Sequence, residues 1–148
     1  MKKKGKVADV CISEVKGTQK HRVEFVDLKQ DYGIEGDAHA GKWHRQVSLL
    51  AAESVSKLRD KIDYDFPSGA FAENILTEGI DLYTIPVGSK IKIGEALCEV
   101  TQIGKECHQD CEIRRICGDC VMPREGIFVK VLKGGRVKAG DDIIVGQE

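Results

Sequence analysis

A succession of short β-branched runs, each closed off by turn residues, most constrains the fold of this chain. The runs cover residues 6–12, 23–28, 47–50, 70–75, 90–93, 96–103, 127–132 and 142–145. Turns between them are marked by Gly88-Ser89, Gly94-Glu95, Gly134-Gly135 and Gly140-Asp141. Short strands joined by tight turns leave edges exposed unless the sheet closes on itself. The sequence therefore predicts a mostly β fold, a closed or partly open β-barrel.

One main helix is predicted beside the strands. Apolar residues recur there at three- and four-residue spacing, and Ser48 is placed to act as the N-cap. The apolar residues are Leu49, Ala52, Val55, Leu58 and Ile62. A short accessory helix is predicted at residues 111–116. Because no linker or low-complexity tract divides the chain, we expect a single domain over residues 1–148.

Length and charge argue against several functional classes. A chain of 148 residues buries a core without needing disulfides or a metal. A net charge of -1 and an aromatic content of 5% disfavour binding of nucleic acid. The basic start has no secretory apolar core behind it, and no run approaches the roughly 20 apolar residues of a membrane span. We therefore expect a cytoplasmic protein that binds no membrane and whose thiols stay reduced.

Most of the cysteines are crowded into one segment. They are Cys107, Cys111, Cys117 and Cys120. Cys107 follows a predicted strand, and Lys105 and His108 beside it favour its thiolate form. Cys111 is close enough in sequence to resolve an oxidised or persulfidated Cys107. The preferred interpretation is a catalytic group of Cys107, His108 and Cys111, with Cys107 as a nucleophilic or sulfur-carrying thiol.

Three other interpretations of this segment stay open. Four thiolates can bind zinc or an iron–sulfur cluster in a compact site, although paired zinc knuckles usually lie about a dozen or more residues apart, which is wider than the spacing here. Cys117 and Cys120 also resemble a dithiol pair, without the βαβ pattern that such a pair usually has around it. The cysteines can also be buried and inert.

A glycine-rich loop over residues 33–46 carries a second group of polar residues. Its glycines let the backbone turn tightly and approach a ligand. Arg45 can bind a phosphate through two hydrogen bonds, while His39 and His44 supply protons or hydrogen bonds and Asp37 orients a histidine. The loop therefore predicts an anion-binding site. The alternative is a structural turn in which Asp37 caps backbone amides.

Two further residues are candidates for the same pocket. Asn74 follows Glu73 inside an otherwise apolar predicted strand, where its amide can recognise the edge of a ring. The alternative is an asparagine that bridges backbone groups. Arg124 precedes the run 127–132 and lies near the cysteines in sequence, so it adds a second cation.

Together these motifs resemble the MOSC domain, named for the C-terminal domain of the molybdenum-cofactor sulfurase. The small, stand-alone bacterial members are the most similar. The resemblance rests, in order, on residues 33–41, 44–50, 69–75, 86–88, 104–108, 124–128 and 140–141. It covers nearly the whole chain.

The resemblance implies a role in handling sulfur for the molybdenum cofactor (molybdopterin). Such domains look like receivers of sulfane sulfur, as a persulfide on one cysteine, from a separate pyridoxal-phosphate cysteine desulfurase. They deliver it to a molybdenum centre in a biosynthetic or acceptor enzyme. The matching cysteine is Cys107, which coordinates molybdenum in cofactor-bound relatives. By the same likeness the cofactor pocket is lined by Asp37, His39, His44, Arg45, Asn74, Lys105 and Arg124.

The expected function is therefore binding of the molybdenum cofactor, carriage of sulfur on Cys107, or both. Pyridoxal phosphate is expected only on the partner, because a desulfurase needs a large domain with a Schiff-base lysine. One alternative is a partner-binding module stabilised by zinc on Cys107, Cys111, Cys117 and Cys120. Another is a small molybdenum-dependent reductase of N-hydroxylated compounds, although such relatives usually have an additional barrel segment or an electron-transfer domain.

Overall fold

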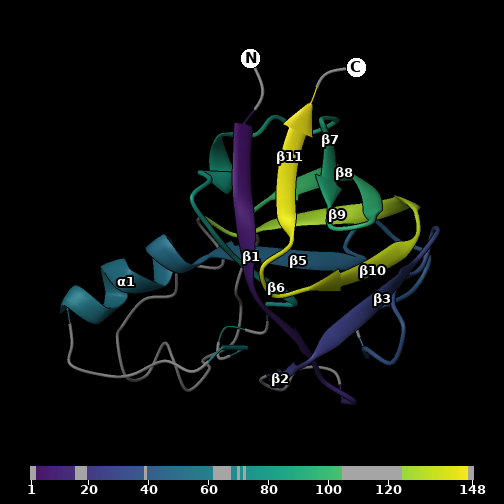
Figure 1. The fold of residues 1–148 in the computed structure, drawn as a ribbon, viewed down its shortest axis with the longest axis horizontal. Coiled ribbons are helices and arrows are strands. Elements are labelled where there is room, and N and C mark those ends of the chain that lie inside the picture. The colour runs from purple at the N-terminus through teal and green to yellow at the C-terminus, as the bar shows by residue number, and fades with distance from the viewer. Residues whose placement is uncertain are drawn as a thin grey trace.

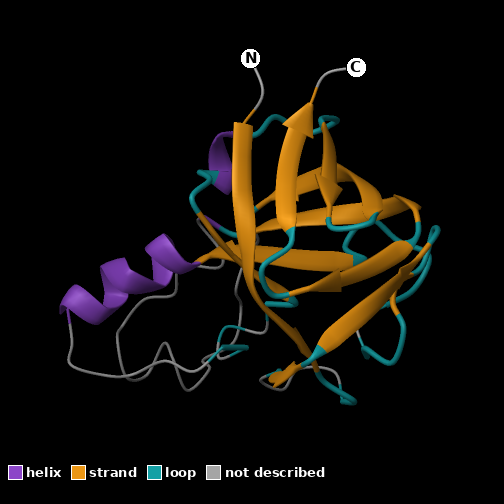
Figure 2. Ribbon diagram, in the orientation of Figure 1, coloured by secondary structure: helices purple, strands orange, loops and turns teal. Residues whose placement is uncertain are grey.

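The computed structural model describes residues 3–15, 20–38, 40–61, 68–69, 71, 73–104 and 125–146. Strands form the body of the molecule, and one helix extends from its side (Figure 2). No helix in the described part of the chain is long and apolar enough to cross a membrane.

A closed seven-strand β-barrel is the centre of the fold (Figure 1). Its strands are β1 (Lys3–Ile12), β5 (Val47–Ala51), β6 (Ile75–Glu78), β7 (Lys90–Ile93), β8 (Ala96–Ile103), β9 (Ile127–Lys133) and β11 (Asp142–Gly146). Around the barrel they are ordered β11-β7-β8-β9-β5-β6-β1, and β1 pairs with β11 to close the ring. The prediction of a mostly β barrel is confirmed.

The neighbouring strands of the barrel are antiparallel except β5 and β6, which are parallel. A parallel pair needs a crossover connection, and helix α1 (Ala52–Lys61) lies in that connection. A 3-10 helix, η1 (Leu82–Thr84), follows β6.

Smaller elements flank the barrel. β2 (His21–Val23) pairs with the end of β1, whereas β3 (Phe25–Lys29) joins β10 (Gly135–Lys138) and β4 (Gly33–Ile34) in a separate three-stranded sheet. The run predicted as one strand over residues 23–28 is therefore two strands in two sheets. The chain changes sheet at Glu24, which lies between them.

Apolar side chains from every barrel strand fill the interior. Register places Val10, Ile75, Leu49 and Ile127 side by side on β1, β6, β5 and β9, and all are buried in the core cluster. Burying a side chain of this size stabilises the fold by about 1.5–3 kcal/mol. The candidate site lies on the outer face of this wall, where Ser48 of β5, Phe128 of β9 and Gln102 of β8 are neighbours.

Two predicted boundaries are wrong. Ser48 does not cap the helix: it lies in β5, where its neighbours Val47 and Leu49 pair with β9, and the helix begins only at Ala52. β6 begins at Ile75 rather than at residue 70, because Glu73 and Asn74 use their side chains to bind backbone groups of loops and other strands. The helix predicted at 111–116 lies outside the described residues.

Candidate functional site

One row of residues crosses the outer wall of the barrel. Gln102 on β8 pairs with Phe128 on β9, which pairs with Ser48 on β5. Asn74 lies beside Ser48, and the Cys11 N–H of β1 donates to the Asn74 carbonyl at 2.7 Å. None of these residues belongs to the core cluster, although Ser48 and Phe128 each lie between two of its members. The row joins parts of the sequence that are far apart.

A β-bulge places Gln102 in this row. Val100 is fully buried in the core, so regular alternation would direct Gln102 inward as well. The register between β8 and β9 shifts between Val100 and Gln102, which puts one extra residue, Thr101, into β8. Gln102 then lies opposite Phe128, on the outer face. The Thr101 hydroxyl shares its one hydrogen between the carbonyls of Phe128 and His44, which draws the segment before β5 onto β8.

His44 and Arg45 meet at the Gln102 side chain. The oxygen Oε1 of Gln102 lies 2.9 Å from His44 Nε2 and accepts a hydrogen bond from Arg45 Nε at 3.0 Å. The Arg45 guanidinium also lies over two aromatic rings, with Cζ 5.3 Å from the centroid of Phe128 and 5.9 Å from that of Trp43. These contacts fix a half-buried cation without neutralising it, since neither Gln102 nor an aromatic ring carries a charge.

The described residues that flank the cysteine segment lie beside Gln102, the partner of Arg45 and His44. Gln102 Nε2 donates to the Gly104 carbonyl at 2.7 Å, and the Gly104 N–H donates to the Gly126 carbonyl at 2.6 Å. Ser54 of α1 donates a hydrogen bond to Glu125, the residue before Gly126. Gly104 and Gly126, which flank this segment, are therefore neighbours, and Gly104 is bound to Gln102.

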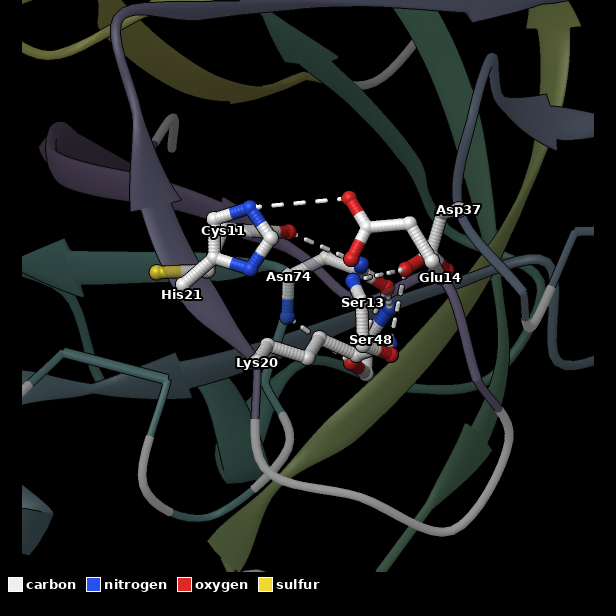
Figure 3. A network of polar contacts seen from close by, with 8 residues as sticks. All are labelled: Cys11, Ser13, Glu14, Lys20, His21, Asp37, Ser48 and Asn74. Atoms are coloured by element: carbon white, nitrogen blue, oxygen red, sulfur yellow. Dashed lines mark hydrogen bonds and ion pairs between the residues drawn. The ribbon is translucent and has the colours of Figure 1, made fainter.

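Asn74 braces three strands of the wall (Figure 3). Its Oδ1 accepts from the Ser48 N–H at 3.0 Å and from the Ser48 hydroxyl at 3.2 Å, while its Nδ2 donates to the Cys11 carbonyl at 3.1 Å. Asn74 is 1% exposed. These contacts are those of the bridging asparagine that we gave as the alternative to ring recognition.

Asp37 is held by a buried ion pair (Figure 3). Lys20 Nζ lies 2.8 Å from Asp37 Oδ1, and the two side chains are 2% and 0% exposed. The same oxygen accepts the Ser13 N–H at 3.1 Å. The pair therefore fastens the glycine-rich loop to the chain that follows β1. Asp37 does bind a backbone amide, as the structural alternative predicted, and its main partner is a lysine that the sequence interpretation had not considered.

Glu73 is a second buried carboxylate in this region. It accepts the N–H groups of Gly69 at 2.7 Å and Phe71 at 3.1 Å. Burial raises the pKa of Glu73 above its usual value, against the opposing effects of these hydrogen bonds and of Lys20. Burial, with Glu73 and Asp9 nearby, raises the pKa of the Cys11 thiol to about 12. Cys11 is therefore a neutral thiol at physiological pH.

The structure thus divides the predicted site residues into groups. His44 and Arg45 are brought together, next to the start of the cysteine segment, while Asp37 and Asn74 are buried in the supporting wall. Eight predicted residues lie outside the described part of the chain: His39, Lys105, Cys107, His108, Cys111, Cys117, Cys120 and Arg124. The described residues contain no group of three or more His, Cys, Asp or Glu side chains that could hold a metal ion.

Sequence reasoning missed Gln102 and Lys20. Gln102 belonged to a strand that was predicted with its correct bounds, but the pair Thr101-Gln102 interrupts the alternation after Val100, and this was the available signal for a bulge. Lys20 had no such signal, because its carboxylate partner is distant in sequence.

The family follows from the comparison of sequences. Residues 36–144 match the MOSC domain, and the chain belongs to the MOSC domain family, which is associated with the molybdenum cofactor and its sulfuration. None of the curated proteins compared with the chain matches it.

Solved structures share the fold. The YuaD protein of Bacillus subtilis superposes with a TM-score of 0.82 at 20% identity, covering 100% of this chain and 99% of that one. YiiM from Escherichia coli has a TM-score of 0.70 at 20% identity, covering 98% and 70%. YiiM from Geobacillus stearothermophilus has a TM-score of 0.75 at 17% identity, covering 97% and 75%.

Proposed function

We propose that this domain holds an oxyanionic group, the phosphate of molybdopterin, on Arg45 and His44 and carries sulfane sulfur as a persulfide on Cys107. The observation that carries the proposal is the junction at Gln102. That residue binds the side chains of Arg45 and His44 and the Gly104 carbonyl, three positions before Cys107. In this proposal the sulfur-bearing cysteine and the side chains that hold the cofactor phosphate belong to one region of the surface.

The residues present fit the phosphate end of this cofactor. The two terminal amino groups of Arg45 bind no described residue, and a guanidinium presents such groups in the fork geometry that matches an oxyanion. His44 can add a hydrogen bond from an exposed position. Asp37 and Asn74 support the site in this proposal, since their side chains bind Lys20 and Ser48. When bound, the cofactor supplies molybdenum, to which Cys107 is the proposed ligand.

The sulfur step that we propose is a thiol–persulfide exchange. The Cys107 thiolate attacks the outer sulfur of a persulfide on a cysteine desulfurase. A new S–S bond forms at Cys107 as the S–S bond of the donor breaks, and the donor leaves as a thiolate. No oxidant is consumed, because the sulfane sulfur passes between thiols. The acceptor would be a molybdenum enzyme or an enzyme that builds its cofactor.

The test is intact mass and elemental analysis of the purified protein after incubation with a desulfurase and cysteine. Wild-type protein should gain about 32 Da per sulfur transferred, and Cys107→Ala should not. Cys98→Ala is the matched control, because Cys98 lies in the core and burial raises the pKa of its thiol to about 12. Equal persulfidation of Cys107→Ala and wild type would disprove the carrier role.

Elemental analysis separates the alternatives. About one zinc per chain, with a lower melting temperature after chelation, would favour the zinc-stabilised module on the four cysteines. Molybdenum with reduction of N-hydroxylated substrates in the presence of an added electron donor would favour the reductase. The sulfur-carrier hypothesis predicts a persulfide on the protein and no bound zinc.

A further inference from the structure

We infer that Gln102 is a positioning residue: it sets the donor state of His44 and the orientation of Arg45 for an oxyanion, and it couples both to the start of the cysteine segment. The inference rests on the proposed function, because it concerns the same anion site. The juxtaposition that carries it is one half-buried amide in contact with three separate groups.

The orientation of the Gln102 amide follows from its partners. The Gly104 carbonyl can only accept a hydrogen bond, so the amide nitrogen Nε2 must face Gly104, as observed at 2.7 Å. Oε1 then faces Arg45 and His44. Arg45 Nε is always a donor, which is consistent with this orientation.

This orientation determines which nitrogen of His44 carries a proton. Because Oε1 is an acceptor, His44 Nε2, 2.9 Å away, must be protonated. In the neutral imidazole, Nδ1 is then the acceptor, and it becomes a second donor when the ring is protonated. Nε2 of His44 is therefore bound to Gln102, and Nδ1 is left for a ligand.

Arg45 is constrained by the same contact. Gln102 binds Nε, and Cζ lies over the rings of Phe128 and Trp43, so displacement of the side chain would lose these contacts. The two Nη groups keep their charge and their hydrogens for a ligand. The ligand class that fits is a tetrahedral oxyanion such as a phosphate monoester.

The third contact reaches the cysteine segment. Gly104 has a φ of +71°, a conformation that favours glycine, and it is followed directly by Lys105. Its carbonyl is bound to Gln102 and its N–H to Gly126. Movement of Gln102 on binding of an anion would therefore reach the point at which the segment begins.

The experiment titrates inorganic phosphate into the protein without cofactor or desulfurase and follows the Arg45 Nε–H, His44 ring and Gly104 signals by NMR. Gln102→Glu keeps the shape of the side chain. It adds a negative charge beside Arg45 and has no N–H for Gly104. Gln102→Leu removes all three contacts. Gln30→Glu, at an exposed turn, is the control for added charge.

We expect wild-type His44 to be protonated at Nε2 and the Arg45 Nε–H to exchange slowly. Gln102→Leu should perturb all three signals together. Gln102→Glu should weaken phosphate binding roughly tenfold or more, because the new carboxylate competes for Arg45. Gln30→Glu should leave the signals and the affinity unchanged.

A wild-type His44 protonated only at Nδ1, or unchanged Arg45 and Gly104 signals in folded Gln102→Leu and Gln102→Glu, would overturn the inference. Phosphate affinity in Gln102→Glu equal to that of wild type would do the same. Failure of persulfide transfer to Cys107 would instead count against the proposed function, because these signals involve no sulfur chemistry.

Discussion

Two groups of polar residues beside the barrel differ in what they can do. In the first, Lys20 and Asp37 are buried and paired at 2.8 Å, so their charges cancel inside the protein. In the second, Arg45 and His44 are half-buried or exposed and bind a neutral amide. Both groups involve the glycine-rich loop. The comparison shows that a charge is available to a ligand where its protein partner is neutral.

The largest expected effect comes from breaking the buried pair. Lys20→Met leaves the Asp37 carboxylate buried without a counter-ion, which should destabilise the fold by about 3–5 kcal/mol. Urea unfolding followed by circular dichroism measures the loss. The double variant Lys20→Met with Asp37→Leu should recover much of it. A loss below about 1 kcal/mol for the single variant would contradict the structural role of the pair.

Substitution of Arg45 should lower ligand binding rather than stability, the opposite of the expectation for Lys20. Arg45→Gln should lower phosphate affinity about tenfold or more while changing the free energy of unfolding by less than about 1 kcal/mol. Arg45→Lys keeps the charge but loses the fork geometry, and it should restore only part of the affinity. Isothermal titration and thermal melting measure the two quantities. A large loss of stability with unchanged phosphate affinity would show that Arg45 has a structural role and not a binding role.

Glu73, which is also buried, should make the free energy of unfolding depend on pH. Its pKa is raised in the folded state, so the folded protein binds a proton more tightly than the unfolded chain, whose carboxyl has a pKa near 4.5. This group therefore lowers stability as pH rises from about 4.5 through the folded pKa, by up to about 1.4 kcal/mol per pH unit. Glu73→Gln should remove that component. Urea unfolding over a pH series compares the two slopes, and parallel profiles would show that Glu73 titrates normally.

The smallest effect concerns a buried polar group without a partner. Thr77 on β6 is 0% exposed, and its hydroxyl is unpaired in the structure. Thr77→Val should therefore stabilise the protein by about 1 kcal/mol, because an unsatisfied hydroxyl is replaced by a methyl group. Thr84→Val is the control, since the Thr84 hydroxyl donates to the Asp81 carbonyl at 2.7 Å and its loss should not stabilise. Differential scanning calorimetry distinguishes the two.

Sequence patterns predicted much of the barrel. The bounds of β7 and β8 agree with the predicted runs, because alternation and flanking glycines are local properties. The start of the helix was predicted too early. The apolar stripe continues back to Leu49, and nothing local shows that β5 pairs with strands on both of its sides.

The candidate site was predicted less completely. Arg45 and His44 were singled out from residue type and loop composition, and the structure places them together. Asp37 and Asn74 were singled out by the same reasoning, and the structure places both among buried protein partners. Residue type indicates what a side chain can bind, but the partner that it has comes from distant parts of the chain.

The sequence by itself determined the class of fold and the family, because strand periodicity, turns and motif order are written along the chain. Only the tertiary structure decided which charges are paired, which are available, and that Gln102 joins Arg45 and His44 to the cysteine segment. The physical reason is register. One bulge in β8 turns Gln102 outward, and hydrogen bonds across strands then bring together residues that are more than fifty positions apart.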